Sequence, residues 1–288
     1  AGMGEAPRWF QLYWSKNNEL VASLVRRAEA CGCEAIVVTL DTTMLGWRPR
    51  DLDLACLPFL RGQGIAQYTS DPVFRQMVEQ PAPAEMATRT GSITPVTLLN
   101  LFRLLRRYPG GFFHNLRSGR ALRGVRTFIN TYSRPSLSWE DLSFLRKHTS
   151  LPMLLKGILD PEDARRAVQE GVDGIIVSNH GGRQVDGAVA TLDALREIVT
   201  AVGPEYPVLM DSGIRAGADA FKALALGARA VFIGRPYVYA LALHGEKGVA
   251  ELLSNYRADF ELTMGLAGCR EVVEIGAEQL LRITAAEP

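Results

Sequence analysis

The chain has 288 residues, 47% of them hydrophobic, which is enough to form a sizeable core. This length fits a single α/β barrel domain of roughly 250 residues. The formal net charge of +1 gives no reason to expect binding to nucleic acid or to an anionic membrane surface. No apolar run approaches the roughly 20 residues that span a bilayer. Residues 1–10 lack the pattern of a signal peptide, so we expect a cytoplasmic protein.

The cysteines are few and scattered: Cys31, Cys33, Cys56 and Cys269. No further Cys or His cluster accompanies Cys31 and Cys33, so the sequence offers no set of metal ligands. We therefore expect buried free thiols and no metal site.

Two strand–helix pairs open the chain. Residues 9–13 and 35–40 are apolar nearly throughout, which is typical of strands in a parallel sheet that is buried on both faces. The helix between them carries one apolar face, formed by Val21, Leu24, Val25 and Ala28.

The regular alternation stops between residues 48 and 151. Only residues 138–141 resemble the capped start of a clear helix there. A long insertion at the carboxyl end of a barrel strand is typically a lid or a subunit contact, so we interpret residues 49–137 as a lid loop. The alternative is a disordered excursion, but the leucine and aromatic content argues against complete disorder.

The second half alternates strands and helices again. The predicted strands are 153–155, 174–177, 208–210 and 230–233. Asp160 and Pro161 are predicted to start a helix that Gly171 closes. Helices are also expected near 191–202, at 216–226 and from about 248 to 286. With the first two strands this gives six β/α units, whereas a closed (β/α)₈ barrel needs eight.

Polar residues stand at the carboxyl ends of these strands: Tyr13, Asp41, Lys156, His180, Asp211 and the pair Gly234-Arg235. In a parallel barrel such positions converge on one mouth, where active sites lie. A single polar residue at a strand end often only meets water. Six such ends together favour a functional site.

The segment Ser178-Asn179-His180-Gly181-Gly182-Arg183-Gln184 is the most specific motif. Its two glycines permit a tight turn that lets His180 and Arg183 face one ligand. A guanidinium binds a carboxylate in bidentate fashion, and an imidazole can accept a proton near neutral pH. These two groups together suit a 2-hydroxy acid.

With this motif the chain resembles the FMN-dependent 2-hydroxy-acid dehydrogenase/oxidase family. The resemblance is carried by residues 10–13, 39–42, 45–48, 155–157, 178–184, 211–215 and 234–236. Residues 42–49 and the long insertion are most similar to the lactate monooxygenase branch. The resemblance implies a TIM (β/α)₈-type barrel that here lacks the first two β/α units, with one domain over residues 1–288.

The resemblance also implies catalytic roles. His180 is expected to be the general base, with Asp41 favouring the imidazolium as it forms. Arg183 and Arg48 are expected to bind the substrate carboxylate, and Tyr13 to hydrogen-bond the reacting end of the substrate. The expected catalytic residues are His180, Asp41, Tyr13 and Lys156, and the expected substrate-binding residues are Tyr13, Arg48, His180 and Arg183.

By the same resemblance the cofactor is FMN. Lys156 is expected beside the part of the flavin that becomes anionic on reduction. The remaining expected contacts are Gln11, Thr39 and Ser178 at the polar edge of the ring, and Asp211, Ser212, Gly213, Ile214, Arg215, Gly234 and Arg235 around the phosphate.

The implied reaction is the oxidation of a small L-2-hydroxy acid, L-lactate above all, to the 2-keto acid or its decarboxylated product. The implied acceptor is O₂ or another oxidant, and the implied assembly is a homo-oligomer, a tetramer by resemblance. Two alternatives stay open. One is another FMN-dependent barrel enzyme, and the other is a truncated non-catalytic fragment that acts only in binding or assembly.

Overall fold

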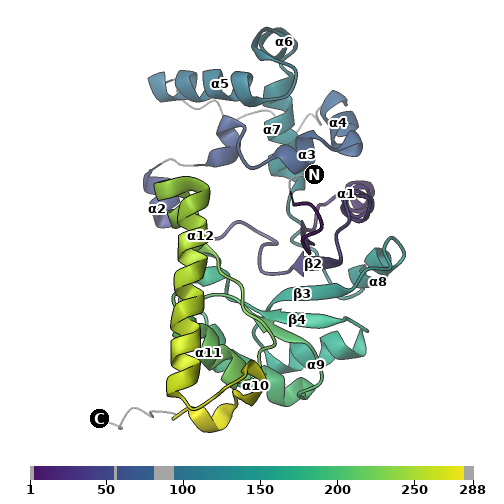
Figure 1. The fold of residues 1–288 in the computed structure, drawn as a ribbon. Helices are drawn as coiled ribbons and strands as arrows, with labels where there is room; N and C mark the ends of the chain where they lie inside the picture. The colour runs from purple at the N-terminus through teal and green to yellow at the C-terminus, as the bar shows by residue number, and fades with distance from the viewer. Residues whose placement is uncertain (1–2, 55–56, 81–93, 282–288) are drawn as a thin grey trace. The chain divides into compact units, whose positions relative to one another are not determined.

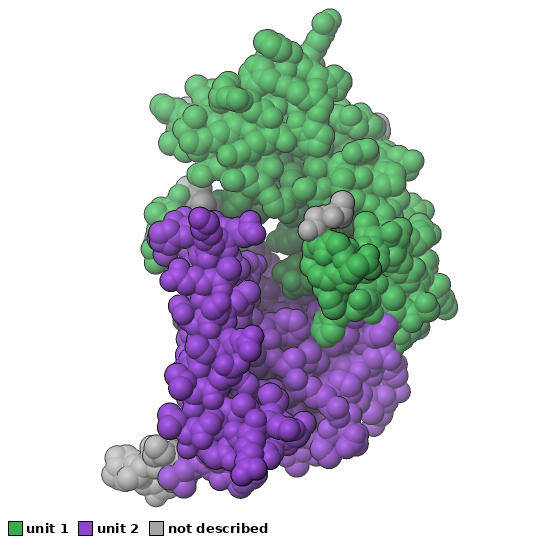
Figure 2. Space-filling model, in the orientation of Figure 1, with its two compact units in different colours: residues 1–34, 48–151 green, residues 35–47, 152–288 purple. Residues whose placement is uncertain are grey.

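The computed structural model describes residues 3–54, 57–80 and 94–281. The chain divides into two compact units, which Figure 2 shows in green and purple. Unit 1 comprises residues 1–34 and 48–151, and unit 2 comprises residues 35–47 and 152–288. Each unit therefore combines segments that are far apart in the sequence.

Unit 1 begins with strand β1 (Trp9–Tyr13) and helix α1 (Asn18–Ala30). The predicted apolar face of α1 is confirmed, because Val21, Leu24, Val25 and Ala28 are all buried. The other elements of unit 1 are α2 (Pro49–Asp53), η1 (Pro58–Arg61), α3 (Ala66–Thr69), α4 (Pro72–Glu79), α5 (Pro95–Arg107), α6 (Phe112–Ser118), α7 (Arg120–Thr131) and α8 (Asp141–Arg146).

The described part of the predicted insertion, 49–137, is mainly helical. Its helices share an aromatic core in which the rings of Tyr68 and Phe128 meet edge to face with centroids 4.9 Å apart. The buried Asp71 caps α4 by accepting the backbone N–H of Val73 at 2.9 Å, and it also pairs with Arg27 at 2.9 Å. This packing gives the segment order, while its role as a lid stays a prediction. Residues 55–56 and 81–93 lie outside the described residues.

Unit 2 contains a parallel sheet with the order β2 (Ala35–Thr39), β3 (Met153–Ile158), β4 (Gly174–Val177) and β5 (Val208–Met210). Figure 1 shows β3 and β4 side by side, with α9 packed against them. The helices and turns of unit 2 are α9 (Pro161–Gln169), η3 (His180–Gly182), α10 (Thr191–Val202), α11 (Gly217–Ala225), α12 (Arg235–Leu266), η4 (Val272–Glu274) and η5 (Ala277–Gln279).

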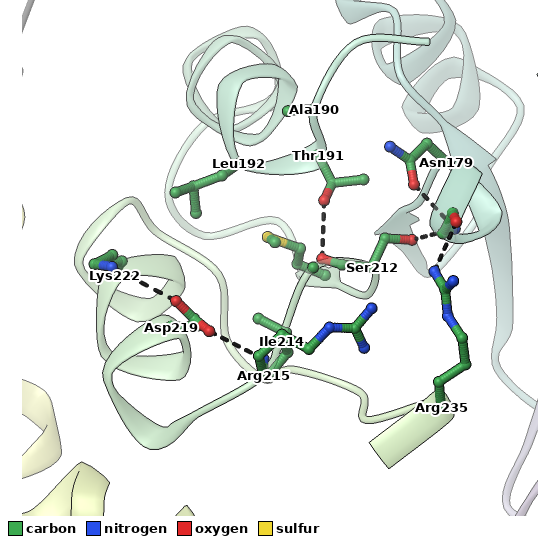
Figure 3. Close-up of a pocket in the computed structure, with 13 residues that line it drawn as sticks. Asn179, Ala190, Thr191, Leu192, Ser212, Ile214, Arg215, Asp219, Lys222 and Arg235 are labelled. Carbon is green, nitrogen blue, oxygen red and sulfur yellow. Dashed lines mark hydrogen bonds and ion pairs between the residues drawn. The ribbon is translucent and has the colours of Figure 1, made fainter. Parts of the chain in front are cut away.

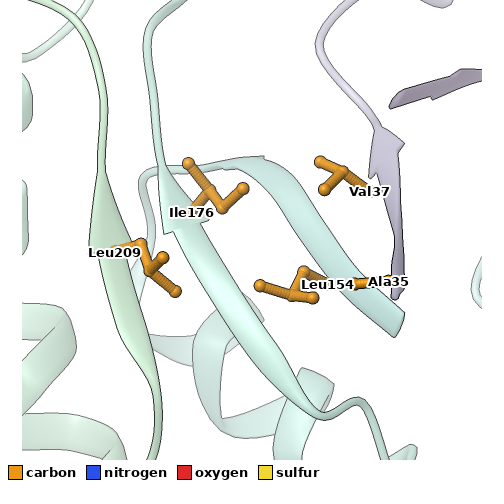
Figure 4. Close-up of a cluster of buried hydrophobic side chains, with 5 residues drawn as sticks. All are labelled: Ala35, Val37, Leu154, Ile176 and Leu209. Atoms are coloured by element: carbon orange, nitrogen blue, oxygen red, sulfur yellow. The ribbon is translucent and has the colours of Figure 1, made fainter. Parts of the chain in front are cut away.

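Strand β2 confirms the prediction of a strand buried on both faces, whereas the same prediction is wrong for β1, in which only Leu12 is buried. Every residue of β2, β4 and β5 is buried. Because successive side chains of a strand point to opposite faces, alternate residues form one layer. Figure 4 shows that layer, which consists of Ala35, Val37, Leu154, Ile176 and Leu209.

The prediction of a last strand over residues 230–233 is wrong in its length. It contributes one parallel bridge, between Met210 and Val231. Gly234 and then helix α12 follow immediately, so the segment turns away before a longer ladder can form. Within the described ranges no further strand pairs with it, and Phe232 is 36% exposed. The helix predicted from about 248 to 286 begins earlier, at Arg235, ends earlier, at Leu266, and is kinked at His244 and Gly245.

The local signals for α9 are confirmed. The Asp160 carboxylate accepts the backbone N–H of Glu162 at 2.7 Å, and Gly171 adopts φ +70° just beyond the helix. Of the cysteines, Cys269 is buried as expected, but Cys31, the C-cap residue of α1, is exposed and Cys33 is half-buried. Cys56 lies outside the described residues. No helix in the described ranges is long and apolar enough to cross a membrane.

Candidate active site

The strands of unit 2 bring their polar carboxyl ends to one edge of the sheet. Thr39 of β2 is in register with Lys156 of β3, which in turn is in register with Ile176 of β4. Asp41 lies two residues beyond the end of β2, and Ser178 and Asp211 directly follow β4 and β5. Four of the predicted strand ends therefore lie on adjacent strands.

His180 and Asp41 form a hydrogen-bonded pair. His180 Nδ1 lies 3.0 Å from Asp41 Oδ1, and the two side chains are only 18% and 14% exposed. When Asp41 is ionised its carboxylate can only accept hydrogen bonds, so a neutral imidazole then carries its hydrogen on Nδ1 and keeps a lone pair on Nε2. Asp41 Oδ2 is buried and has no hydrogen-bond partner among the described residues. This arrangement leaves Nε2 as the imidazole atom that can accept a proton.

A bulge in β3 permits this close packing. The register between β3 and β4 shifts between Lys156 and Ile158, and Gly157 in the bulge adopts φ +107°. A Cβ at Gly157 would lie 3.0 Å from Cβ of Asp41, closer than ordinary packing. Glycine here therefore lets Asp41 approach the strand end that carries Lys156.

The turn that carries His180 is held by hydrogen bonds to its backbone. His180 adopts φ +54°, a left-handed conformation that is uncommon for a residue with a side chain. Its N–H donates to Ser178 Oγ at 3.1 Å. The N–H of Gly181 donates to Asn179 Oδ1 at 3.0 Å and to Ser212 Oγ at 2.9 Å. Such bonds hold a backbone conformation that would otherwise be sparsely populated.

Lys156 lies at the centre of the same network. Its Nζ donates to Ser178 Oγ at 2.7 Å and is 3.0 Å from Asp211 Oδ2. Ser212 Oγ donates to Asp211 Oδ1 at 2.8 Å. The ammonium group is therefore fixed by two partners, and its side chain is only 11% exposed.

A cavity of about 310 Å³ opens beside this network. Figure 3 shows Arg215 and Arg235 pointing into the space beside Ser212, and Lys222 forms part of the lining. Arg235 also donates to the carbonyl oxygen of Gly181 at 2.7 Å. The lining consists of Asn179, Gly181, Ala190, Thr191, Leu192, Met210, Ser212, Gly213, Ile214, Arg215, Asp219, Lys222 and Arg235. Three cations against one carboxylate make this cavity suitable for an anion such as a phosphate monoester.

The predicted site residues are distributed over both units. Unit 2 contains Thr39, Asp41, Lys156, Ser178, His180, Arg183 and the segments 211–215 and 234–235. Gln11, Tyr13 and Arg48 belong to unit 1. There Gln11 Nε2 donates to the Tyr13 hydroxyl at 3.3 Å, and Arg48 lies 3.9 Å from the Asp51 carboxylate. The roles assigned to these three residues stay predictions.

Sequence reasoning missed several residues of the cavity. Lys222 is not among the predicted site residues, yet it lines the cavity and lies 3.5 Å from Asp219. Thr191 also lines it and donates to the carbonyl of Ser212 at 3.1 Å. A signal was available for Lys222, because it stands on the helix that directly follows the predicted phosphate segment 211–215.

Comparisons with known proteins match nearly the whole chain. A sequence profile described as FMN-dependent dehydrogenase matches residues 1–282. L-lactate oxidase of Lysinibacillus sphaericus is 42% identical over 267 residues, which cover 93% of this chain and 59% of that protein. Glycolate oxidase of Spinacia oleracea is 40% identical over 286 residues, covering 97% of this chain and 64% of the relative.

Solved structures also match this chain, and they show its fold. A crystal structure of mandelate oxidase matches with a TM-score of 0.65 and 37% identity, over 93% of this chain and 61% of that one. A mandelate oxidase mutant solved with a monooxide FMN adduct matches with a TM-score of 0.62 and 36% identity, over 93% of this chain and 61% of that one. The predicted fold class, an α/β barrel of the TIM type, is confirmed. The chain spans about three fifths of the length of these relatives.

Proposed function

The chain belongs to the FMN-dependent dehydrogenase family, and from this premise we propose that it oxidises a small L-2-hydroxy acid, with L-lactate as the first candidate. One observation carries the proposal. A paired imidazole, His180 with Asp41, stands on the same turn as the guanidinium of Arg183 and next to a cationic cavity. A base, a carboxylate-binding group and an anion site are the three parts that this chemistry needs.

The residues present fit FMN, the cofactor of the family. Arg215, Arg235 and Lys222 would hold the phosphate, and the backbone of residues 212–214 would support it. Lys156 would supply positive charge beside the flavin ring, with Thr39, Ser178 and Gln11 at the polar edge of the ring. When bound, FMN supplies a two-electron acceptor.

The chain's own residues would manage the proton. Oxidation of a 2-hydroxy acid to the 2-keto acid removes one proton and one hydride equivalent. His180 Nε2 would take the hydroxyl proton, while the Asp41 carboxylate on Nδ1 stabilises the resulting imidazolium. Arg183, Arg48 and Tyr13 would bind the carboxylate and the hydroxyl end of the substrate.

The choice of L-lactate rests on similarity. A relative that is 42% identical over 267 residues is an L-lactate oxidase. The likeness of residues 42–49 to the lactate monooxygenase branch stays a prediction from the sequence. The acceptor is O₂ or another oxidant, and the decarboxylated product forms only where O₂ is reduced while the keto acid is still bound. A homo-oligomeric assembly and a cytoplasmic location remain predictions from the sequence.

The direct test mixes the full chain and FMN with L-lactate in the absence of oxygen and follows flavin absorbance. L-lactate should bleach the flavin, and D-lactate, the matched control, should not. Bleaching by neither lactate, nor by glycolate or L-mandelate, contradicts the proposal. Binding of FMN without any reduction would favour the alternative of a non-catalytic binding fragment.

A second measurement tests the anion site separately. Because the cavity presents three cations, the chain should bind FMN more tightly than riboflavin, which lacks the phosphate. Quenching of flavin fluorescence gives both dissociation constants. Equal constants would contradict the assignment of the phosphate to residues 211–215 and 234–235.

A further inference from the structure

We propose that Gln184 is a positioning residue, whose side-chain amide locks the loop after β2 to the loop after β4 and so holds Asp41 against His180. The inference rests on the proposed function for its catalytic consequence, but the contact itself can be tested without it. The two loops comprise residues 41–46 and 178–184, and both belong to unit 2.

The amide of Gln184 makes three recorded hydrogen bonds to the backbone of the other loop. Nε2 donates to the carbonyl oxygen of Asp41 at 2.7 Å and to that of Met44 at 2.8 Å. Oε1 accepts the N–H of Gly46 at 3.3 Å. The two amide hydrogens and the amide oxygen of Gln184 are thus all directed to a single loop. Both amide hydrogens are used in these bonds.

The backbones of the two loops also approach each other closely. A Cβ at Gly46 would lie 2.7 Å from the carbonyl oxygen of Arg183 and 2.8 Å from Cα of Gln184. Real Cβ atoms do not come this near to backbone, so only glycine fits without a shift of one loop. The contact at Gly46 therefore depends on the same register of the loops as the amide bonds.

Burial of apolar side chains contributes little to the position of the loop after β2. The side chains of Met44, Leu45 and Trp47 are 65%, 49% and 83% exposed, so burial of apolar surface fixes them little. The hydrogen bonds that the loop after β2 makes to Gln184 are therefore important for the position of this loop. Net contributions of hydrogen bonds to stability are modest, but they are enough to shift a loop equilibrium several-fold.

The contact of Gln184 affects the catalytic pair because each loop carries one of its two residues, Asp41 on the loop after β2 and His180 on the loop after β4. Asp41 supplies the carbonyl that Gln184 binds and the carboxylate that His180 Nδ1 binds. His180 and Gln184 lie four residues apart on the same turn. A shift of residues 41–46 would therefore lengthen the Asp41–His180 hydrogen bond, and the imidazole would lose the partner that orients Nε2.

The experiment replaces Gln184 by methionine, which keeps the length of the side chain and removes all three hydrogen bonds. Gln169→Met, an exposed residue at the end of α9, is the matched control. The first readout is exchange with water of the Nδ1 proton of His180, measured by NMR on protein with isotope-labelled histidine. Asp41→Asn identifies the signal, because it weakens the bond to that proton.

We expect Gln184→Met to speed exchange of this proton by about 10-fold, as loss of roughly 1.4 kcal/mol of loop stabilisation would. The rate of flavin reduction by L-lactate should fall by a similar factor, while the apparent dissociation constant of L-lactate changes less than about 3-fold. Gln169→Met should change neither. A folded Gln184→Met protein with the parent's exchange rate overturns the proposal.

Gly46→Ala provides a second route to the same displacement. If Gln184→Met does not fold, a folded Gly46→Ala protein decides the matter, with faster exchange supporting the proposal and unchanged exchange overturning it. Failure of the proposed function is a separate outcome. A parent chain that reduces no flavin contradicts the oxidation of 2-hydroxy acids, while the exchange measurement still tests the role of Gln184.

Discussion

Two residues with side chains, His180 and Ser212, adopt left-handed backbone conformations, with φ of +54° and +73°. For a non-glycine residue this conformation costs roughly 1–2 kcal/mol. The two residues are linked, because the N–H of Gly181 donates to Ser212 Oγ at 2.9 Å. Ser212 Oγ in turn donates to Asp211, the partner of Lys156. The hydrogen bonds of the site thus support the strained turn that presents the imidazole.

Substitutions at Ser212 separate strain from hydrogen bonding. Both Ser212→Ala and Ser212→Gly remove Oγ and its bonds to Gly181 and Asp211. Only glycine relieves the left-handed backbone, so Ser212→Ala should be less stable than Ser212→Gly by about 1 kcal/mol. Urea unfolding of the three proteins measures this difference. An alanine variant as stable as the glycine variant would show that the backbone at Ser212 stores no strain.

The residues of the site differ in how far the sequence reveals them. Asp41, Lys156, His180 and Asp211 could be predicted, because each follows or ends an apolar strand and strand ends are local features. The pairing of Lys156 with Asp211 and Ser178 was not predicted. Gln184 was seen as part of a motif, but its contact with a loop about 140 residues away depends on tertiary register. Local sequence patterns do not show which residues that are far apart in the chain come into contact.

At the scale of elements, predictions succeeded where burial is unambiguous. Strands β2, β4 and β5 are apolar throughout and lie between two covered faces. Residues 230–233 have the same pattern but form only one bridge. A strand needs neighbours as well as an apolar sequence, and the sequence does not show how the neighbours are arranged. The helices of 49–137 were expected only as partial order, because their amphipathic segments are short and interrupted by glycine and proline.

The helical core of unit 1 should show a specific pH dependence. Tyr68 of α3 is 3% exposed, and burial raises the pKa of its hydroxyl from 10.0 to about 12. Because the folded pKa is raised, the stabilisation is fully present below pH 10 and is lost as pH rises toward about 12. The loss amounts to at most about 2–3 kcal/mol.

The measurement is the free energy of unfolding as pH rises from neutral to strongly alkaline. Tyr68→Phe should flatten the alkaline decline relative to the parent chain. Tyr239→Phe is the matched control, since Tyr239 is 62% exposed on α12, and it should leave the decline unchanged. If Tyr68→Phe declines as steeply as the parent, ionisation of Tyr68 is not coupled to unfolding.

At the scale of the whole molecule, we predict a homo-oligomer. Helices α5 and α6 expose large apolar side chains, among them Leu98, Leu99, Phe102 and Phe113. Contiguous exposed apolar surface of this kind favours association. Static light scattering should give a mass above the 31.6 kDa of one chain, and Leu99→Glu combined with Phe102→Glu should lower it. A monodisperse monomer at micromolar concentration would contradict the prediction.

The central claim is that His180, held by Asp41, is the base in the oxidation of a 2-hydroxy acid. The most direct test is anaerobic stopped-flow reduction of the flavin over a range of L-lactate concentrations, with the parent chain and with His180→Gln. Glutamine keeps similar size and hydrogen bonding but cannot take the proton at neutral pH. The limiting rate should fall on the order of 10² to 10⁴. Reduction of the flavin in His180→Gln at the parent rate would contradict the account.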